Sequence, residues 1–525
     1  MSRLSVSNKT GTTRRRLGVG VAVATLATGL AIVGPPSVAT TAGTRAATGD
    51  AARDRKLSDH LPADGTTESP PAPTLRELWA ARSDGSGVDS DVAHAIAVSP
   101  NGTTTYITGR NGGDGTLTDY VTMAYDTGSG RELWAARYDG PAKKTDEAWD
   151  LGVSPDGSRV FVSGASATGS FSSDADYATV AYDARTGDRL WVARYNGPGD
   201  NEDVARALDV SPDGDTVLIT GGSQSDSRFT STDYTTIAYD AATGVRRWIA
   251  RYNGPSNNRD SAQALALSPD GHTAFVTGTS PTSGFLTDDY ATVAYEVATG
   301  NQRWVARYDG PSKATDGAEA LAVSPDGSHV FVTGGSAGRD GGQDYATVAY
   351  DAGSGTEAWV SRYDGPTSGH DTANDLAISP DGSRVFVTGS SSGDYGTVSY
   401  ASATGDELWA ARYDGPVGGP DQAAALVVSP DGSHAYVTGN SVGVSYDIAT
   451  VAYRADSGAD LGADHWRSRY NGPGNDGDAG TALVMTPDGN RLLVTGQSVG
   501  NGTGADYLTL AYGAAPPEIR DQPRD

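Results

Sequence analysis

One position of a repeated ten-residue segment carries side chains that could bind a ligand. The segment has the pattern Asp-x-Ala-x-Ala-Leu-x-Val-Ser-Pro, and its fourth residue changes from copy to copy. Along the chain this fourth residue is His94, Trp149, Arg206, Gln263, Glu319, Asn374, Ala424 and Thr481. The first six are large or polar. They could donate or accept hydrogen bonds, or stack on an aromatic group, where the copies converge. We predict these six as a ligand-binding set; the alternative is that they fill the space between copies.

An aspartate begins the same segment in every copy. These residues are Asp91, Asp146, Asp203, Asp260, Asp316, Asp371, Asp421 and Asp478. A ring of carboxylates would suit Ca²⁺, which prefers oxygen ligands. However, an Asp in every copy is also typical of a loop cap that accepts backbone N–H groups, and we favour this interpretation. A second recurrent Asp, found at Asp119, Asp176, Asp233 and Asp289, is interpreted in the same way, and the metal content stays open.

Motifs for catalysis are weak in this chain. The absence of Cys excludes disulfides, thiolate metal sites and cysteine nucleophiles. The seven His residues lack metal-ligand spacing. Gly-x-Ser-x-Gly occurs around Ser336, Ser391, Ser441 and Ser498, but a nucleophile elbow needs a strand-to-helix turn and these sequences recur at one repeat position. We therefore assign no catalytic residue.

The elements that would position these residues repeat eight times. Eight of the nine Trp occupy one slot, at spacings of 50 to 57 residues: Trp79, Trp134, Trp191, Trp248, Trp304, Trp359, Trp409 and Trp466. A Ser-Pro-Asp-Gly-like turn and an Asp-Tyr-x-Thr-x-Ala-Tyr-like run each recur eight times as well. A fixed period of this length indicates a propeller or a solenoid.

Each period contains four segments that resemble strands. In the fifth copy they are 318–324, 329–333, 345–351 and 358–363, bounded by Gly, Pro, Asp and Ser. We predict an all-β, eight-bladed β-propeller of four-stranded antiparallel blades. The N-terminal segment 75–82 resembles a fourth strand and 506–512 a third strand, so the former should complete the last blade and close the ring.

Two sets of connections vary between copies. These are the loops that follow each Gly-Pro and the loops that join the second and third strands. Propeller topology places both on one face, which we call the variable face; the opposite face carries the uniform turns and is called the turn face. Because function concentrates on variable loops, we expect a binding site on the variable face.

The docking Trp and its surroundings resemble a known family. Ala181, Asp183, Gly187 and Trp191 have the Ala-x-Asp-x-x-x-Gly-x-x-x-Trp form of the tryptophan-docking motif of pyrroloquinoline-quinone-like (PQQ-like) propellers. The Ser-Pro-Asp-Gly-Ser-x-Val-Phe-Val-Thr-Gly stretch is similar to YVTN-type surface propeller repeats. The resemblance implies the blades, and PQQ or Ca²⁺ as conceivable cofactors. Trp149 would match the Trp of a quinone site, but the adjacent cysteines of that site are absent.

The N-terminus resembles an export sequence. Residues 1–39 contain five basic and no acidic residues before an apolar run, with Arg14, Arg15 and Arg16 similar to a twin-arginine signal. We predict a signal peptide at 1–39, a flexible linker at 40–73, the propeller at 74–513 and a polar tail at 514–525. The protein should be secreted or extracellular, or membrane-bound if the signal stays uncleaved. A net charge of −26 argues against nucleic-acid binding.

Two classes of function are open. The first is a secreted or surface-exposed binding scaffold that recognises a glycan, peptide or protein of the cell envelope through the variable face. The second is an extracellular enzyme at the channel mouth, either a PQQ-dependent dehydrogenase or a metal-dependent hydrolase or lactonase. We favour the scaffold, because the catalytic motifs are weak.

Overall fold

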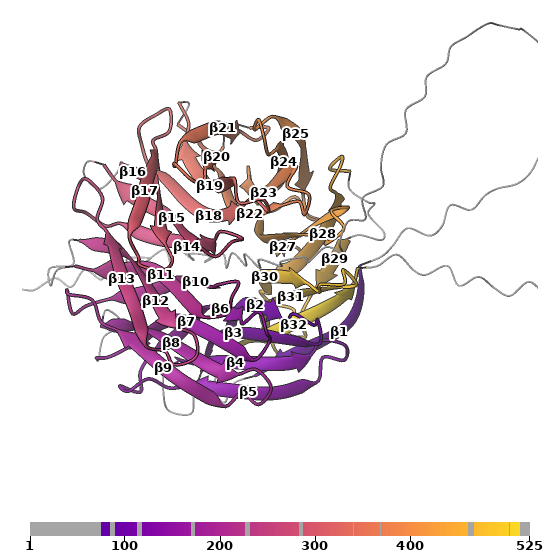
Figure 1. Ribbon diagram of the computed structural model, residues 1–525. Helices are drawn as coiled ribbons and strands as arrows, with labels where there is room; N and C mark the ends of the chain where they lie inside the picture. The colour runs from indigo at the N-terminus through magenta and orange to yellow at the C-terminus, as the bar shows by residue number, and fades with distance from the viewer. Residues whose placement is uncertain are drawn as a thin grey trace, which may run out of the picture.

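The computed structural model describes residues 75–84, 90–112, 118–169, 174–225, 231–282, 287–339, 341–367, 369–459, 467–502 and 504–514. Every regular element in these ranges is a β-strand, and the strands form the blades of a ring (Figure 1). The predicted signal peptide at 1–39, the linker at 40–73, most of the tail and Trp466 lie outside the described residues.

The strands form eight four-stranded antiparallel sheets, so the predicted eight-bladed β-propeller is confirmed. The first four blades comprise β2 (Val92–Val98), β3 (Thr104–Gly112), β4 (Thr118–Asp126), β5 (Glu132–Tyr138); β6 (Asp146–Val153), β7 (Arg159–Ala167), β8 (Ala175–Asp183), β9 (Arg189–Tyr195); β10 (Asp203–Val210), β11 (Thr216–Gln224), β12 (Thr232–Asp240), β13 (Arg246–Tyr252); and β14 (Ser261–Leu267), β15 (Thr273–Pro281), β16 (Asp288–Glu296), β17 (Gln302–Tyr308).

The other four blades complete the ring. They comprise β18 (Asp316–Val323), β19 (His329–Ala337), β20 (Gln343–Asp351), β21 (Glu357–Tyr363); β22 (Asp371–Ile378), β23 (Arg384–Ser391), β24 (Asp394–Ala401), β25 (Glu407–Tyr413); β26 (Asp421–Val428), β27 (His434–Val442), β28 (Tyr446–Arg454), β29 (Arg467–Tyr470); and β30 (Ala479–Met485), β31 (Arg491–Val499), β32 (Ala505–Gly513) with β1 (Arg76–Ser83).

The first strand of the chain closes the ring, as predicted. Strand β1 pairs with β32 from Arg76↔Gly513 to Ser83↔Tyr507, so the last blade combines both ends of the described chain. The innermost strands of neighbouring blades contact one another all the way round, and β30 contacts β2. The eighth blade therefore packs against the first, and the ring is closed.

The recurrent Trp joins each blade to the next. Trp134 donates its indole N–H to the carbonyl of Ala184 in the following blade at 3.0 Å, and Trp79, Trp191, Trp248, Trp304, Trp359 and Trp409 make the equivalent bond. The same ring covers the Gly of the next docking motif. A Cβ on Gly187 would lie 2.7 Å from the Trp134 ring, and its φ of +74° also favours glycine.

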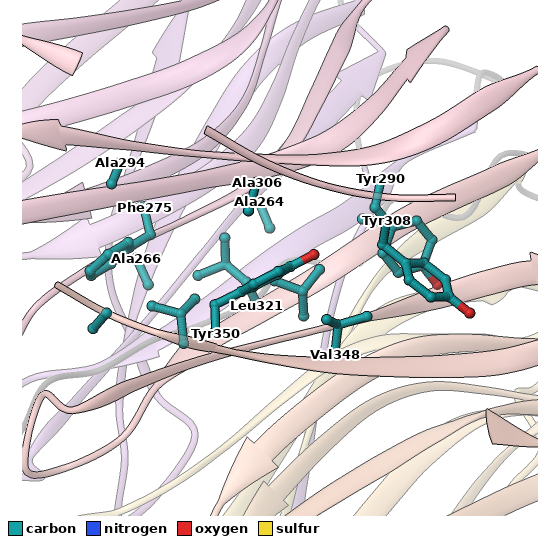
Figure 2. Packing of buried hydrophobic residues seen from close by; sticks show 14 of the residues in the cluster. Ala264, Ala266, Phe275, Tyr290, Ala294, Ala306, Tyr308, Leu321, Val348 and Tyr350 are labelled. Carbon is teal, nitrogen blue, oxygen red and sulfur yellow. The ribbon is translucent and has the colours of Figure 1, made fainter. Parts of the chain in front are cut away.

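The core lies between adjacent blades. In one cluster Phe275 and Ala294 of the fourth blade pack against Leu321 and Tyr350 of the fifth (Figure 2). Each of these side chains is almost completely buried. The large aromatic residues thus supply inter-blade area, which contributes about 2–3 kcal/mol for each such side chain.

The second and third strands are longer than the sequence indicates. β19 continues from the predicted end at Thr333 to Ala337, because the run Gly334-Gly335-Ser336 still pairs with β18 and β20. Glycine resembles a strand end in a sequence, but here the neighbouring backbone requires it: a Cβ on Gly334 would lie 1.9 Å from the carbonyl oxygen of Gly317. The extension brings both strands to the variable face.

The strand order also confirms the two faces. Because consecutive strands are antiparallel, the connections from second to third strand and from each blade to the next emerge together on the variable face. The shortest of them is the Ser392-Gly393 turn, where both φ angles are positive. No helix in the described ranges is long and apolar enough to cross a membrane.

Candidate functional site

The variable position of the innermost strand is a β-bulge in all eight blades. The pairing register shifts at this residue, between Ala93 and Ala95, between Ala148 and Asp150, and likewise in the other six blades. A bulged residue is left out of the ladder, which re-aims its side chain. The eight residues identified from the repeat therefore share one structural position, the bulge of the innermost strand.

Three of the predicted residues meet on one side of the ring, together with Glu147. The Trp149 ring lies 4.5 Å from the His94 ring of the preceding blade, measured between centroids and at 30°. The Arg206 guanidinium of the following blade lies 4.4 Å from the Trp149 ring centroid. His94 Nε2 lies 3.1 Å from Glu147 Oε1, which also accepts a bond from Arg110 Nη1 at 3.1 Å. We call His94, Glu147, Trp149 and Arg206 the axis cluster.

Burial and charge act in opposite directions in this cluster. Burial acts to raise the pKa of Glu147, but the hydrogen bond from His94 and the charges of His94, Arg110 and Arg206 outweigh it and lower this pKa. Burial lowers the pKa of Arg206, although Glu147, Glu202 and Glu319 act against that change. The cluster therefore holds a cation and an anion that burial disfavours, and each charge acts on the pKa of the other.

Glu319 lies two blades beyond Arg206 and belongs to the same electrostatic unit. Burial raises the pKa of Glu319 to about 7, and Arg206 acts to lower it. The two residues come from the bulges of non-adjacent blades, so this effect acts between blades that are not neighbours. Glu319 thus adds a carboxyl group whose charge changes near neutral pH.

The other predicted residues are distributed differently. Gln263 is half-buried in the bulge of β14, between the blades of Arg206 and Glu319. Asn374 turns to the next blade and donates to the carbonyl of Ala423 at 2.8 Å. Thr481 similarly donates to the carbonyl of Ala93 at 2.7 Å. The large or polar side chains of the first five blades therefore lie on one side of the ring. The sixth to eighth blades carry residues at this position that bridge to the next blade or are small.

The recurrent first-strand Asp caps the loop before it. Asp146 Oδ2 accepts the N–H of Gly140 at 2.6 Å, and Asp260 Oδ2 accepts that of Gly254 at 2.8 Å. Asp203, Asp316, Asp371, Asp421 and Asp478 accept the equivalent N–H. Residues 85–89 before Asp91 lie outside the described ranges, and Asp91 accepts the N–H of Gly112 at the end of β3. These contacts agree with the capping interpretation of the ring.

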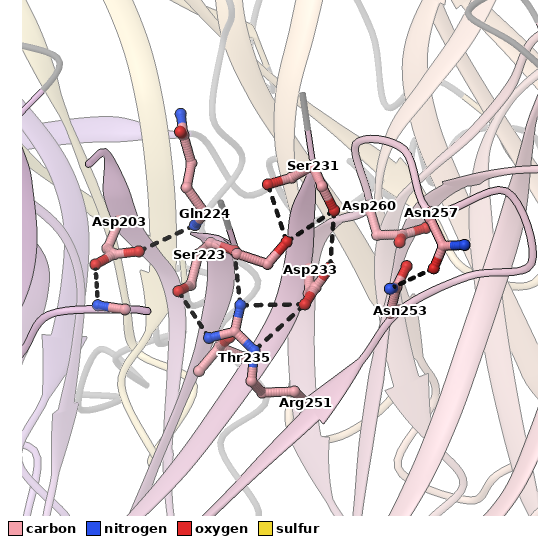
Figure 3. Close-up of polar contacts among 12 residues, drawn as sticks. Asp203, Ser223, Gln224, Ser231, Asp233, Thr235, Arg251, Asn253, Asn257 and Asp260 are labelled. Atoms are coloured by element: carbon pink, nitrogen blue, oxygen red, sulfur yellow. Dashed lines mark hydrogen bonds and ion pairs between the residues drawn. The ribbon is translucent and has the colours of Figure 1, made fainter. Parts of the chain in front are cut away.

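The second recurrent Asp is part of a polar clamp that the sequence analysis missed. Figure 3 shows Asp233 paired with Arg251 of the fourth strand, 3.1 Å apart. Arg251 also donates to the Ser223 hydroxyl and carbonyl, and to the Tyr195 hydroxyl of the preceding blade at 2.8 Å. All eight blades have the Asp–Arg pair. In the sequence, the clamp is indicated by the Arg that recurs directly before the last Tyr of the fourth strand.

The clamp also explains the Gly-x-Ser-x-Gly sequences. Ser336, Ser391, Ser441 and Ser498 are fully buried at the end of second strands, and each hydroxyl accepts a bond from the clamp Arg. These serines therefore stabilise the blades, in agreement with the structural interpretation of the motif.

The residues around Trp149 do not fit a PQQ group stacked in the quinoprotein manner. Such stacking needs an open indole face, but here the indole already contacts His94 on the side of the preceding blade and Arg206 on the side of the following blade. A planar quinone would have to displace one of them and remove a charged or hydrogen-bonding group that acts on Glu147. We therefore derive no step through a quinone.

One protein-family model matches the sequence. It is described as outer membrane protein assembly factor BamB, and it matches residues 71–376, which is more than half of the 525 residues. No curated protein matches the sequence.

Solved structures similar to this chain are propellers of several kinds. Sqt1 from Chaetomium thermophilum, bound to the N-terminus of the ribosomal protein L10, is 15% identical with a TM-score of 0.53, covering 84% of this chain and 100% of its own. BamB from Moraxella catarrhalis is 15% identical with a TM-score of 0.44, covering 86% and 99%. A quinohemoprotein alcohol dehydrogenase from Pseudomonas putida HK5 is 14% identical with a TM-score of 0.47, covering 86% and 77%. At 15% identity the similarity to Sqt1 shows the fold alone.

Proposed function

The chain belongs to the β-propeller family described as outer membrane protein assembly factor BamB, and we propose that it is a secreted or surface-exposed scaffold that binds a peptide or protein of the cell envelope. The observation that carries the proposal is the axis cluster. It combines Arg206 and the Trp149 ring, both at the variable position of the repeat, with the carboxylate of Glu147 from a neighbouring position.

The chemistry of the cluster favours a peptide over a glycan. Glycan sites typically offer an open aromatic face, but Trp149 is in contact with both neighbours. Arg206, Glu147 and Glu319 instead offer charge-assisted hydrogen bonds to the carboxylate, ammonium or backbone groups of a peptide. The Sqt1 propeller bound to the N-terminus of L10 gives a precedent for peptide binding by this fold.

The experiment is a peptide-display selection on the full chain, followed by anisotropy measurements with the enriched peptides. We expect Arg206→Ala and Trp149→Ala to weaken binding about tenfold or more, since each removes a half-buried side chain at the centre of the proposed site. His434→Ala, on the turn face, is the matched control and should leave binding unchanged. Peptide binding that survives both axis variants, or binding only to a glycan array, would contradict the proposal.

Export is the second part of the proposal. The basic N-terminal residues, the apolar run that follows them and the Cys-free composition support it. Mass spectrometry of the protein from culture medium should find a mature form that begins near Thr40. Replacement of Arg14 and Arg15 by Lys should retain the protein inside the cell. Recovery of the full-length chain from the cytosol alone would overturn this part.

A further inference from the structure

Three aspartates meet on the variable face where the first blade joins the second. Asp119 lies at the start of β4, Asp139 follows β5, and Asp146 begins β6. One carboxylate oxygen from each residue lies within 4.8 Å of the other two. Asp119 and Asp146 are completely or almost completely buried, at 2% and 0% exposed, so this is not a solvated acidic surface.

Each carboxylate uses one oxygen for the protein. Asp119 Oδ2 lies 3.3 Å from Arg137, Asp139 Oδ2 lies 3.6 Å from Lys143, and Asp146 Oδ2 accepts the Gly140 N–H. The remaining oxygen of Asp146, Oδ1, is buried. The Oδ1 atoms of Asp119 and Asp139 are buried and have no hydrogen-bond partner in the described part of the chain. An unpartnered buried carboxylate oxygen is costly. Single ones also occur at Asp260 and Asp447, but here two belong to one three-carboxylate cluster, which points to a missing cationic partner.

Other blades show that this arrangement is not a requirement of the fold. Asn196, Asn253 and Asn471 replace the loop Asp in three blades, and the Asn253 amide turns away to donate to Asn257 (Figure 3). The clusters that contain Asp289, Asp344 and Asp394 also bring three carboxylates together. Within the described residues none of those three clusters has a buried carboxylate oxygen without a partner.

We propose that Asp119, Asp139 and Asp146 bind a Ca²⁺ ion at the junction of the first two blades. Two oxygens on one Ca²⁺ are at most about 5 Å apart, since each lies at about 2.3–2.6 Å from the ion, and the observed spread is within that limit. Mg²⁺, at about 2.0–2.1 Å, needs a tighter set. Arg137 and Lys143 also face the carboxylates and oppose the ion, but Lys143 is 76% exposed and free to move into solvent.

The test is calorimetric titration of the chelator-treated full chain with CaCl₂, with the melting temperature measured in parallel. We expect saturable binding and a higher melting temperature in Ca²⁺. Asp139→Asn should weaken binding at least tenfold and abolish the thermal shift. This variant copies the residue that the second blade already has at Asn196, so it is compatible with a folded blade.

Asp309→Asn is the matched control. Asp309 occupies the same loop position and also pairs with a Lys, Lys313, but its cluster lacks the buried unpartnered oxygens. It should keep wild-type binding. No heat and no thermal shift for the wild type, unchanged binding by Asp139→Asn, or an equal loss in Asp309→Asn would overturn the assignment.

Discussion

Trp79 of the first strand donates its indole N–H to the carbonyl of Thr127 at 3.1 Å, and its ring covers Gly130 of the first blade. Strand β1 is itself part of the last blade. This one side chain therefore joins the eighth blade to the first with the same contact that joins every described pair of neighbours. The ring closure is a repeat of the ordinary blade junction.

Replacement of Trp79 by Ala should destabilise the whole ring. Loss of a large packed ring and its hydrogen bond costs about 3 kcal/mol, near the lower end for buried Trp because Trp79 is half-buried. Urea denaturation followed by tryptophan fluorescence measures the change in midpoint. Leu78→Ala, at the neighbouring exposed position, should change stability by less than about 0.5 kcal/mol. Equal effects of the two variants would refute the closure argument.

Gly130→Ala should be more harmful than the same change at another glycine of similar backbone conformation. Both Gly130 and Gly341 have positive φ, which costs an Ala about 1–2 kcal/mol. A Cβ at Gly130 would also lie 2.6 Å from the Trp79 ring, whereas nothing lies within 4 Å of one at Gly341. The overpacking adds roughly 1–3 kcal/mol. Denaturation midpoints of the two variants measure the difference, and similar midpoints would contradict it.

Arg206→Gln should raise the pKa of Glu319 above its value of about 7. Arg206 is the charge that acts against burial at this carboxyl group, so its removal leaves the desolvation unopposed. An NMR titration of the protein with labelled Glu, assigned by comparison with Glu319→Gln, measures this pKa. Gln263→Ala is a control that removes no charge. A Glu319 pKa that does not rise in Arg206→Gln would show that the two groups are not coupled.

Stability should fall as the pH rises from about 5 to 9. Burial raises the pKa of Asp150 to about 8 and the pKa values of Asp209 and Asp375 to about 7. An unfolded Asp titrates near 3.9, so the folded chain holds more protons than the unfolded chain throughout this window. The stabilisation is present at low pH and is lost as the pH passes the folded-state values.

The melting temperature as a function of pH measures this effect. We expect a decrease of roughly several degrees from pH 5 to pH 9, since about 1 kcal/mol corresponds to a few degrees in large domains. Asp150→Asn cannot ionise and should show a flatter profile. A melting temperature that is constant or rises over this interval would contradict the proposed protonation of the buried carboxyl groups.

The repeat made the fold predictable from the sequence. Eight copies of the Trp slot and of the Ser-Pro-Asp-Gly turn fix the number of blades, and the strand-like segment around Trp79 predicts the closure. The strand ends were less predictable, because Gly334 and Gly335 resemble a terminus although they are paired. Glycine is required at Gly334 because the neighbouring backbone leaves no room for a Cβ, and that backbone is close only in the folded sheet.

The candidate site was predictable as a list of positions but not as an arrangement. The repeat identified His94, Trp149 and Arg206 by their variation at one slot. It could not indicate Glu147, which occupies a different slot and meets His94 only across a blade junction. The Asp–Arg clamp was missed because its residues are the same in every copy, so no variation drew attention to them. Only the pairing of the third and fourth strands shows that the Asp and the Arg meet.

The pairing of β1 with β32 also has a consequence for the order of folding. Seven blades consist of consecutive residues, so each can form from local contacts as soon as its own strands exist. The eighth needs contacts such as Arg82 with Ser498, which are 416 residues apart. Contacts of such separation form slowly, although their entropic cost grows only with the logarithm of loop length. A partner that holds β1 away from β32 would therefore stall assembly at its final step and leave seven folded blades as an open arc.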